Sequence, residues 1–79
     1  MNITIQYFAH LRETRGLSEE SIQTSSKTVK DLYLELKNKH QFELEVHDLK
    51  VAKDDAFCAW ETELVEGDTI TYLPPVGGG

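Results

Sequence analysis

The sequence predicts an α+β domain in which a mixed sheet of four to five strands packs on one main helix. Three observations predict this class. Alternating apolar and polar segments, typical of half-buried strands, stand near both ends of the chain. One clear amphipathic segment with helical spacing lies between them. A chain of 79 residues has room for one small core, because a domain of this size buries only about 60–65% of its unfolded surface.

The first predicted strand covers residues 2–8, NITIQYF. Its alternation places Ile3, Ile5 and Tyr7 on one face, which we expect to be the core face. The same period of two leaves Phe8 on the opposite face.

Two shorter elements follow. Residues 9–16, AHLRETRG, are typical of a short helix or helical turn that Gly16 ends. Residues 20–25 form a weaker strand around Ile22, which we expect to pair with the first strand as a hairpin.

The main helix is predicted to begin after Thr28. Thr28 and Asp31 resemble a capping box, with Asp in place of the usual Glu or Gln, so the Thr28 hydroxyl can accept from free amides. Apolar residues then recur at helical spacing over about three turns, at Val29, Leu32, Tyr33 and Leu36. Cationic side chains that complement the helix dipole stand at the end, namely Lys37, Lys39 and His40.

The second half of the chain contains shorter elements. Residues 41–50 are ambiguous, because apolar and acidic residues alternate there. We expect a strand over residues 49–53, a turn over residues 54–56 and a returning strand over residues 57–60. A Gly-Asp turn then leads into a final strand over residues 69–73.

This order of elements favours the β-grasp, the ubiquitin-like roll. In that fold the first and last strands lie side by side and parallel in the middle of the sheet, so the C-terminus projects from its end. Ile70 and Tyr72 should then face inward and Leu73 outward.

Composition excludes several classes of function. A net charge of −6, from 14 acidic and 8 basic residues, disfavours nucleic acid and favours a protein partner with a basic face, unless the acidity serves solubility alone. No apolar run could span a membrane, and the histidines lack metal-ligand spacing. The single Cys58 allows no internal disulfide, is expected to be a buried structural thiol, and fits a cytoplasmic protein.

The last eight residues, YLPPVGGG, differ from the rest. We expect a domain over residues 1–73 and a flexible tail over residues 74–79, which Pro74 and Pro75 hold extended for roughly 20 Å. Terminal glycines fit a channel too narrow for a Cβ and leave a carboxylate unhindered for activation by ATP. The alternative is a disordered end without function.

Residues 65–79, VEGDTITYLPPVGGG, resemble the C-terminal motif of the molybdopterin synthase small subunit, a MoaD-like sulfur carrier. Residues 7–13, YFAHLRE, are similar to the first strand and helix of the same family. Residues 28–36 and 51–57 match more loosely, so the resemblance spans nearly the whole chain. Two positions depart from the family pattern. Gly77 stands where the family usually has Ala or Ser, which leaves the tail chemistry intact. Asp54 stands where Asn is common, and both residue types tolerate the turn, so the fold is unchanged.

The resemblance implies a sulfur-donor subunit that is not an enzyme by itself. Gly79 would be adenylated by an E1-like adenylyltransferase (MoeB-like) that uses ATP, and then converted to a thiocarboxylate with sulfur from a persulfide protein. The chain itself would bind no cofactor or metal. In a heterotetramer with the large subunit (MoaE-like), the loaded tail would donate sulfur to cyclic pyranopterin monophosphate to form the molybdopterin dithiolene. The tail residues inserted into that partner would be Pro74, Pro75, Val76, Gly77 and Gly78.

We expect a docking surface beside the root of the tail. If the first and last strands are adjacent, Phe8 and Leu73 form an outward apolar patch. Arg12 would add a charged anchor and Phe57 would extend the patch, and the resemblance implies that this face docks the large subunit. Alternatively, residues 9–16 cover Phe8.

Three other functions remain open. A carrier for another pathway, such as thiazole synthesis, would share the Gly-Gly end without the two prolines. A ubiquitin-like modifier would form isopeptide bonds with lysines. A plain β-grasp interaction domain would make no use of the terminal carboxylate.

Overall fold

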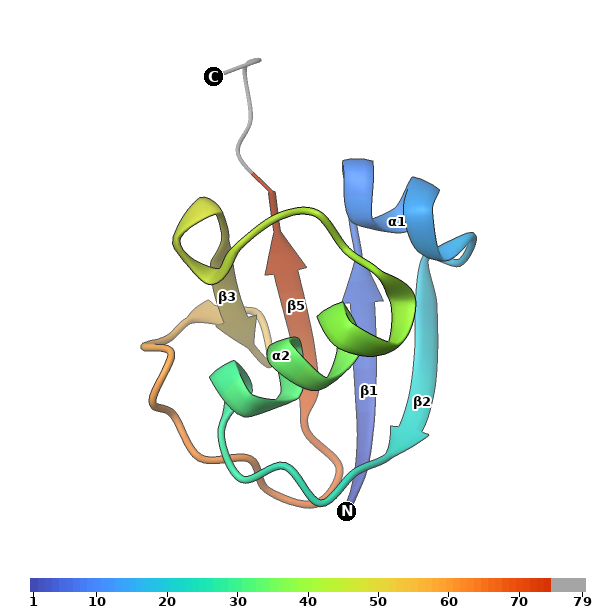
Figure 1. Ribbon diagram of the computed structural model, residues 1–79. Coiled ribbons are helices and arrows are strands. Elements are labelled where there is room, and N and C mark those ends of the chain that lie inside the picture. Colours follow the sequence, from blue (N-terminus) through green and yellow to red (C-terminus); the bar gives the residue numbers. More distant parts are fainter. Residues whose placement is uncertain (75–79) are drawn as a thin grey trace.

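The computed structural model describes residues 1–74 (Figure 1), so the predictions made for residues 75–79 lie outside the described part. One five-stranded sheet has the strand order β2-β1-β5-β3-β4, and α2 covers one of its faces, which confirms the α+β, ubiquitin-like β-grasp prediction. Along the chain the elements are β1 (Asn2–Tyr7), α1 (Ala9–Arg15), β2 (Glu19–Gln23), α2 (Val29–His40), the short 3-10 helix η1 (Val46–Asp48), β3 (Lys50–Lys53), β4 (Ala56–Phe57) and β5 (Thr69–Leu73).

The two central strands run parallel, as predicted. β1 pairs with β5 from Thr4↔Thr69 to Tyr7↔Tyr72, and every other pair of neighbouring strands is antiparallel. Both central strands therefore end at the same edge of the sheet, where α1 begins and where the chain leaves β5 (Figure 1). The end of the domain and the start of the predicted tail lie in the middle of that edge.

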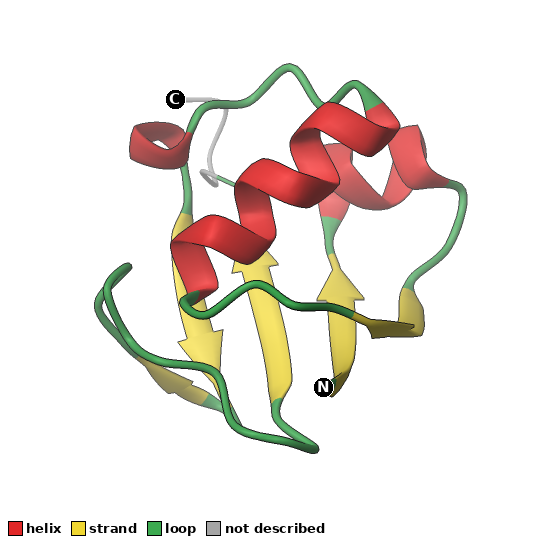
Figure 2. Ribbon diagram, turned by 60° about the horizontal axis from the view of Figure 1, so that its bottom comes forward, coloured by secondary structure: helices red, strands yellow, loops and turns green. Residues whose placement is uncertain are grey.

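Helix α2 crosses the inner face of the sheet (Figure 2). The Thr28 hydroxyl accepts from the Asp31 amide at 3.1 Å, which confirms the predicted cap. At the other end Gln41 adopts a left-handed conformation with φ 61° and stops the helix. The predicted apolar stripe is fully buried, at Val29, Leu32, Tyr33 and Leu36.

The sheet contributes the other half of the core. Ile3, Ile5 and Tyr7 from β1 are buried, as are Ile70 and Tyr72 from β5, so the predicted inward faces are correct. These side chains pack with the stripe of α2 into one hydrophobic cluster.

Two features of the second half differ from the prediction. The returning strand covers two residues rather than residues 57–60, because the chain bends after Cys58, whose amide still donates to the Val51 carbonyl at 3.1 Å. Cys58 is half-buried rather than fully buried. The bend carries the Trp60 ring against that of Tyr72, with ring centres 5.9 Å apart and planes 12° apart.

The β3–β4 turn depends on two aspartates with positive φ. Asp54 and Asp55 have φ of 49° and 73°, the left-handed region that Asp and Asn tolerate better than most residues. The Asp54 carboxylate also accepts from the Thr69 amide at 3.1 Å. The prediction that Asp in place of Asn keeps this turn is confirmed, and the turn is tied to the start of β5.

Candidate functional site

On the face of the sheet opposite α2, which we call the outer face, a row of side chains crosses all five strands. Strand register places Glu19, Gln6, Thr71, Ala52 and Phe57 side by side, in that order. The Gln6 amide nitrogen donates to Glu19 at 3.3 Å, and its oxygen accepts from the Thr71 hydroxyl at 2.9 Å. This outer face is therefore polar and internally hydrogen-bonded toward β2, and apolar toward β4.

The next row of the outer face lies where the chain leaves the sheet. Leu73 pairs with Lys50 across β5 and β3, and the half-buried Leu73 side chain faces away from α2, as predicted. Phe8 follows β1 directly and 44% of its surface is exposed, so the alternative in which residues 9–16 cover it is wrong. The structure thus places both predicted docking residues at the same end of the outer face.

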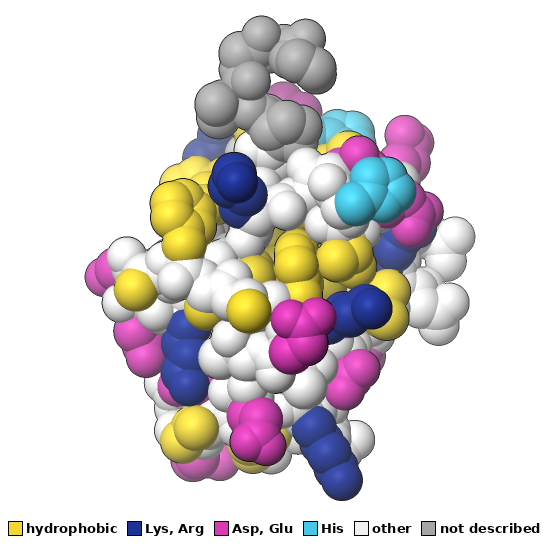
Figure 3. Space-filling model, turned by 90° about the vertical axis from the view of Figure 1, so that its left-hand side faces the viewer, with side chains coloured by type: hydrophobic (Ala, Val, Ile, Leu, Met, Phe, Trp, Pro, Cys, Tyr) yellow, Lys and Arg dark blue, Asp and Glu magenta, His cyan; other side chains and the backbone are white. Residues whose placement is uncertain are grey.

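All four residues predicted for docking line one hollow of about 580 Å³, which we call the root hollow. Phe8 caps the start of α1 and Arg12 lies within that helix. Phe57 comes from β4 and Leu73 from the end of β5. Further lining residues, which sequence reasoning did not identify, are Ala9, His47, Asp48, Leu49, Lys50 and Pro74. In Figure 3, hydrophobic side chains gather on the side of the molecule that β3 and β4 occupy, with Lys or Arg side chains next to them.

The root hollow is apolar with a predominantly basic rim. Arg12 and Lys50 are exposed cations on its lining. Asp48 is the acidic residue there, and its carboxylate lies 3.6 Å from the ring of His47, which is 82% exposed. In a protein of net charge −6, this excess of basic over acidic residues is local. The arrangement fits an apolar partner surface that carries carboxylates, so at this site the basic partner face that the net charge favoured is not the one expected.

A partly buried polar network fixes α1 beside the root hollow. Glu20 on β2 accepts two hydrogen bonds from Arg15 at 2.7 and 2.9 Å, and one from the Tyr7 hydroxyl at 2.6 Å. The hydrogen bonds from Arg15 hold the pKa of Glu20 below its usual value, and burial raises that of Tyr7. The network ties the C-terminal end of α1 to β1 and β2, and so positions Phe8 and Arg12. Sequence reasoning missed it because its three members lie on three different elements, β1, α1 and β2, and no local pattern reports how these pack together.

The predicted tail is described only at its first residue. Pro74 follows β5 directly, is buried and lines the root hollow, so the chain starts out from this apolar surface. Val76 and the three glycines, like Pro75, belong to the undescribed part. Within residues 1–74 no group of three or more His, Cys, Asp or Glu side chains could hold a metal ion. No helix among the same residues has the length and apolarity needed to cross a membrane.

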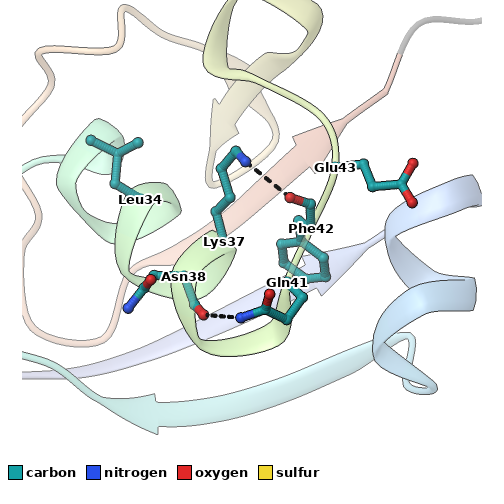
Figure 4. A pocket seen from close by; sticks show the side chains of 6 residues that line it. All are labelled: Leu34, Lys37, Asn38, Gln41, Phe42 and Glu43. Carbon is teal, nitrogen blue, oxygen red and sulfur yellow. Dashed lines mark hydrogen bonds between the residues drawn. The ribbon is translucent and has the colours of Figure 1, made fainter.

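Another hollow, of about 420 Å³, lies at the C-terminal end of α2 (Figure 4). Lys37 donates to the Phe42 carbonyl at 3.0 Å, and the Gln41 amide donates to the Asn38 carbonyl at 3.0 Å. These bonds satisfy carbonyls around the helix end, which is a structural role. Leu34, 43% exposed, lies at the margin of this helix-end hollow and offers a reference position remote from the root hollow.

The chain is similar in sequence and structure to several known proteins. The model of the ThiS family matches residues 5–79. A Pyrococcus furiosus protein assigned as molybdopterin converting factor subunit 1 is 31% identical, with a TM-score of 0.81 over 96% of this chain and 99% of that one. The small archaeal modifier protein 1 of Methanosarcina acetivorans is 26% identical, with a TM-score of 0.80 over 99% of this chain and 96% of that one.

A third similar structure contains two proteins. It is the Helicobacter pylori complex of subunits 1 and 2 of molybdopterin-converting factor, and the matching chain is 26% identical, with a TM-score of 0.70 over the full length of both chains. No curated protein sequence matches this chain significantly. The relationship is therefore supported by the family model and by the similar solved structures.

Proposed function

The chain belongs to the ThiS family of small ubiquitin-like sulfur carriers, and we propose that it is the sulfur-donor small subunit of a molybdopterin synthase. The observation that carries this proposal is the position of Pro74. The chain leaves the central strand β5 at the wall of the root hollow, so a partner docked on Phe8, Phe57 and Leu73 would receive the tail directly.

The tail chemistry belongs to the terminal glycine. The Gly79 carboxylate attacks the α-phosphate of ATP on an E1-like enzyme, which gives an acyl-adenylate and releases pyrophosphate. Sulfur delivered by a persulfide protein then displaces AMP, and the product after reduction by a thiol is a thiocarboxylate. Glycine at this position leaves the carbonyl carbon open to both partners, because no Cβ stands beside it.

Sulfur transfer then takes place in the partner. The loaded tail enters the active site of the large subunit and gives its sulfur to cyclic pyranopterin monophosphate, and water restores the carboxylate. Two such transfers supply both sulfur atoms of the dithiolene. The acid–base groups belong to the large subunit, so this chain is a substrate-like subunit of a cytoplasmic heteromer rather than an enzyme by itself.

A test of this proposal begins with the mass of the intact protein. Protein produced in a host with sulfur-transfer enzymes should include a fraction in which one C-terminal oxygen is replaced by sulfur. That fraction, mixed with the large subunit and the pterin precursor, should form molybdopterin. Unloaded protein under all such conditions would contradict the sulfur-carrier proposal, and loaded protein that serves only a thiazole-forming acceptor would move it to that pathway.

A second candidate function is protein modification. The likeness to the Methanosarcina acetivorans modifier favours it, because its TM-score equals that of the Pyrococcus furiosus protein within 0.01. An activated Gly79 attacked by a lysine amine would form an isopeptide bond instead of a thiocarboxylate. Mass spectrometry of trypsin-digested cell extracts would then find residues 54–79 of this chain, the peptide after its last Lys or Arg at Lys53, attached to lysines of other proteins.

A further inference from the structure

A second apolar hollow adjoins the root hollow across Phe57. It measures about 390 Å³, and we call it the edge hollow. Its lining is Leu49, Lys50, Val51, Phe57, Cys58 and Trp60. Leu49, Lys50 and Phe57 line the root hollow as well, so the two are neighbouring parts of one surface.

The Phe57 ring is the ridge between these parts. It is 70% exposed, the largest exposed fraction among the big hydrophobic side chains of residues 1–74. It also lines a third hollow of about 210 Å³, which extends over the outer face to Gln6 and Thr71. A protruding aromatic side chain between concave sites is the shape that partner surfaces enclose in interface hot spots.

The walls of the edge hollow are fixed before any partner arrives. Trp60 stacks on Tyr72 and meets the ring of Tyr33 edge-on, with centres 6.2 Å apart. Leu49 and Val51 belong to the buried core. A preformed apolar site binds at a small cost in conformational entropy, because its side chains are already ordered.

The charge of the edge hollow also differs from that of the protein. Lys50 is the charged member of its lining, whereas the whole chain carries 14 acidic and 8 basic residues. An apolar side chain with a carboxylate beside it would fit both the hollow and the lysine.

We propose that the edge hollow is the second half of the docking surface, and that the large subunit seats an apolar side chain there with a carboxylate next to Lys50. This inference rests on the proposed function, since it extends the surface assigned to the same partner. The docked subunit would then enclose Phe57 from both sides and reach around the β4 edge to Cys58.

Cys58 makes the proposal testable in the unaltered protein. It is the single cysteine of the chain and is half-buried in the lining of the edge hollow, so N-ethylmaleimide modifies one known position. The rate of modification, followed by intact mass, should fall at least about tenfold when a cysteine-free large subunit is present in saturating amount. The reference protein is Cys58→Ser combined with Leu34→Cys, which moves the thiol to the helix-end hollow and should react equally fast with and without the partner.

A complementary measurement uses the modified protein. Chain alkylated at Cys58 should bind the large subunit at least about tenfold more weakly than untreated chain, because the added group fills the hollow. Circular dichroism verifies that the alkylated chain is folded. A complex that forms on size exclusion while Cys58 reacts at its free rate would overturn this inference and leave the proposed function standing. No complex at all would overturn both.

Discussion

The hydroxyl of Tyr72 donates a hydrogen bond of 2.8 Å to the carbonyl of Val29, 43 residues earlier in the chain. This buried bond fastens β5, the strand that leads into the tail, to the first turn of α2. Burial also raises the pKa of Tyr72 well above its ordinary value, so the hydroxyl remains a donor at any physiological pH.

Tyr72→Phe tests the contribution of this bond to stability. We expect a loss of about 1–2 kcal/mol in the free energy of unfolding, because the replacement removes a buried hydrogen bond and changes no apolar contact of the ring. In a domain of this size that lowers Tm by roughly 4–8 °C per kcal/mol. Tyr33→Phe, which loses a 2.7 Å bond to the Leu44 carbonyl, is the comparison. Equal stability of wild type and Tyr72→Phe in urea would show that this hydrogen bond does not stabilise the fold.

The network at Glu20 predicts a specific pH dependence. Because the pKa of Glu20 is lowered in the folded state, chiefly by its hydrogen bonds from Arg15, the ionised form stabilises the fold. That contribution is complete above the unfolded pKa of about 4.3 and is lost as pH falls through the lower folded pKa. Glu20→Gln should therefore cost about 1.5–3 kcal/mol at pH 7 and progressively less toward pH 3.

The control for this prediction is the neighbouring Glu19. It is exposed and accepts a single 3.3 Å bond from Gln6, so Glu19→Gln should change the free energy of unfolding by less than about 0.5 kcal/mol. Urea unfolding at pH 7, 5 and 3 measures both variants. A penalty for Glu20→Gln that does not diminish at low pH would show that side-chain shape, rather than charge, is what the network requires.

Local periodicity was sufficient to predict most of the fold. The alternation of β1 and β5 and the four-residue stripe of α2 correspond to the buried side chains. These patterns are visible in sequence because a half-buried element repeats its environment every two residues in a strand and about every 3.6 in a helix. The same period of two identified Phe8 and Leu73 as outward neighbours at the end of the sheet.

Residues 41–50 and β4 were harder for a different reason. Phe42, Leu44 and Val46 alternate as in a strand, yet Phe42 is buried against Tyr33 and Tyr7, and Val46 begins η1. Here tertiary packing decides the conformation, because Phe42 fills the core directly after the left-handed turn at Gln41. His47, Lys50 and the Glu20 network were missed likewise. The packing of η1, β3 and α1 against other elements brings these residues together, and no local sequence pattern reports that packing.

The docking surface is tested by a charge placed on Phe8. Phe8→Asp should weaken binding of the large subunit at least about tenfold, because a carboxylate in the root hollow would have to be desolvated. Leu34→Asp is the matched control: Leu34 is 43% exposed and Phe8 44%, but Leu34 lies on α2 away from this surface. Calorimetric titration measures both, and circular dichroism verifies that both monomers fold. Equal affinity for the two variants would show that the partner docks elsewhere.

Deletion of Gly79 separates the chemistry of the tail from the stability of the domain. When the variant is incubated with the activating enzyme, ATP and a sulfur donor, it should not be converted to a thiocarboxylate. Its terminal carboxylate would lie one residue short of the position at which the enzyme adenylates the chain. The free energy of unfolding should change by less than about 0.5 kcal/mol, since the buried core of the described chain lies between Ile3 and Tyr72.

Gly79→Ala keeps the length but places a Cβ beside the reacting carbon, so it should load more slowly than wild type. Intact mass and thermal melting measure the two properties. Normal loading of the deletion variant would contradict the role of Gly79, and a large drop in Tm would assign the last residue to the fold instead.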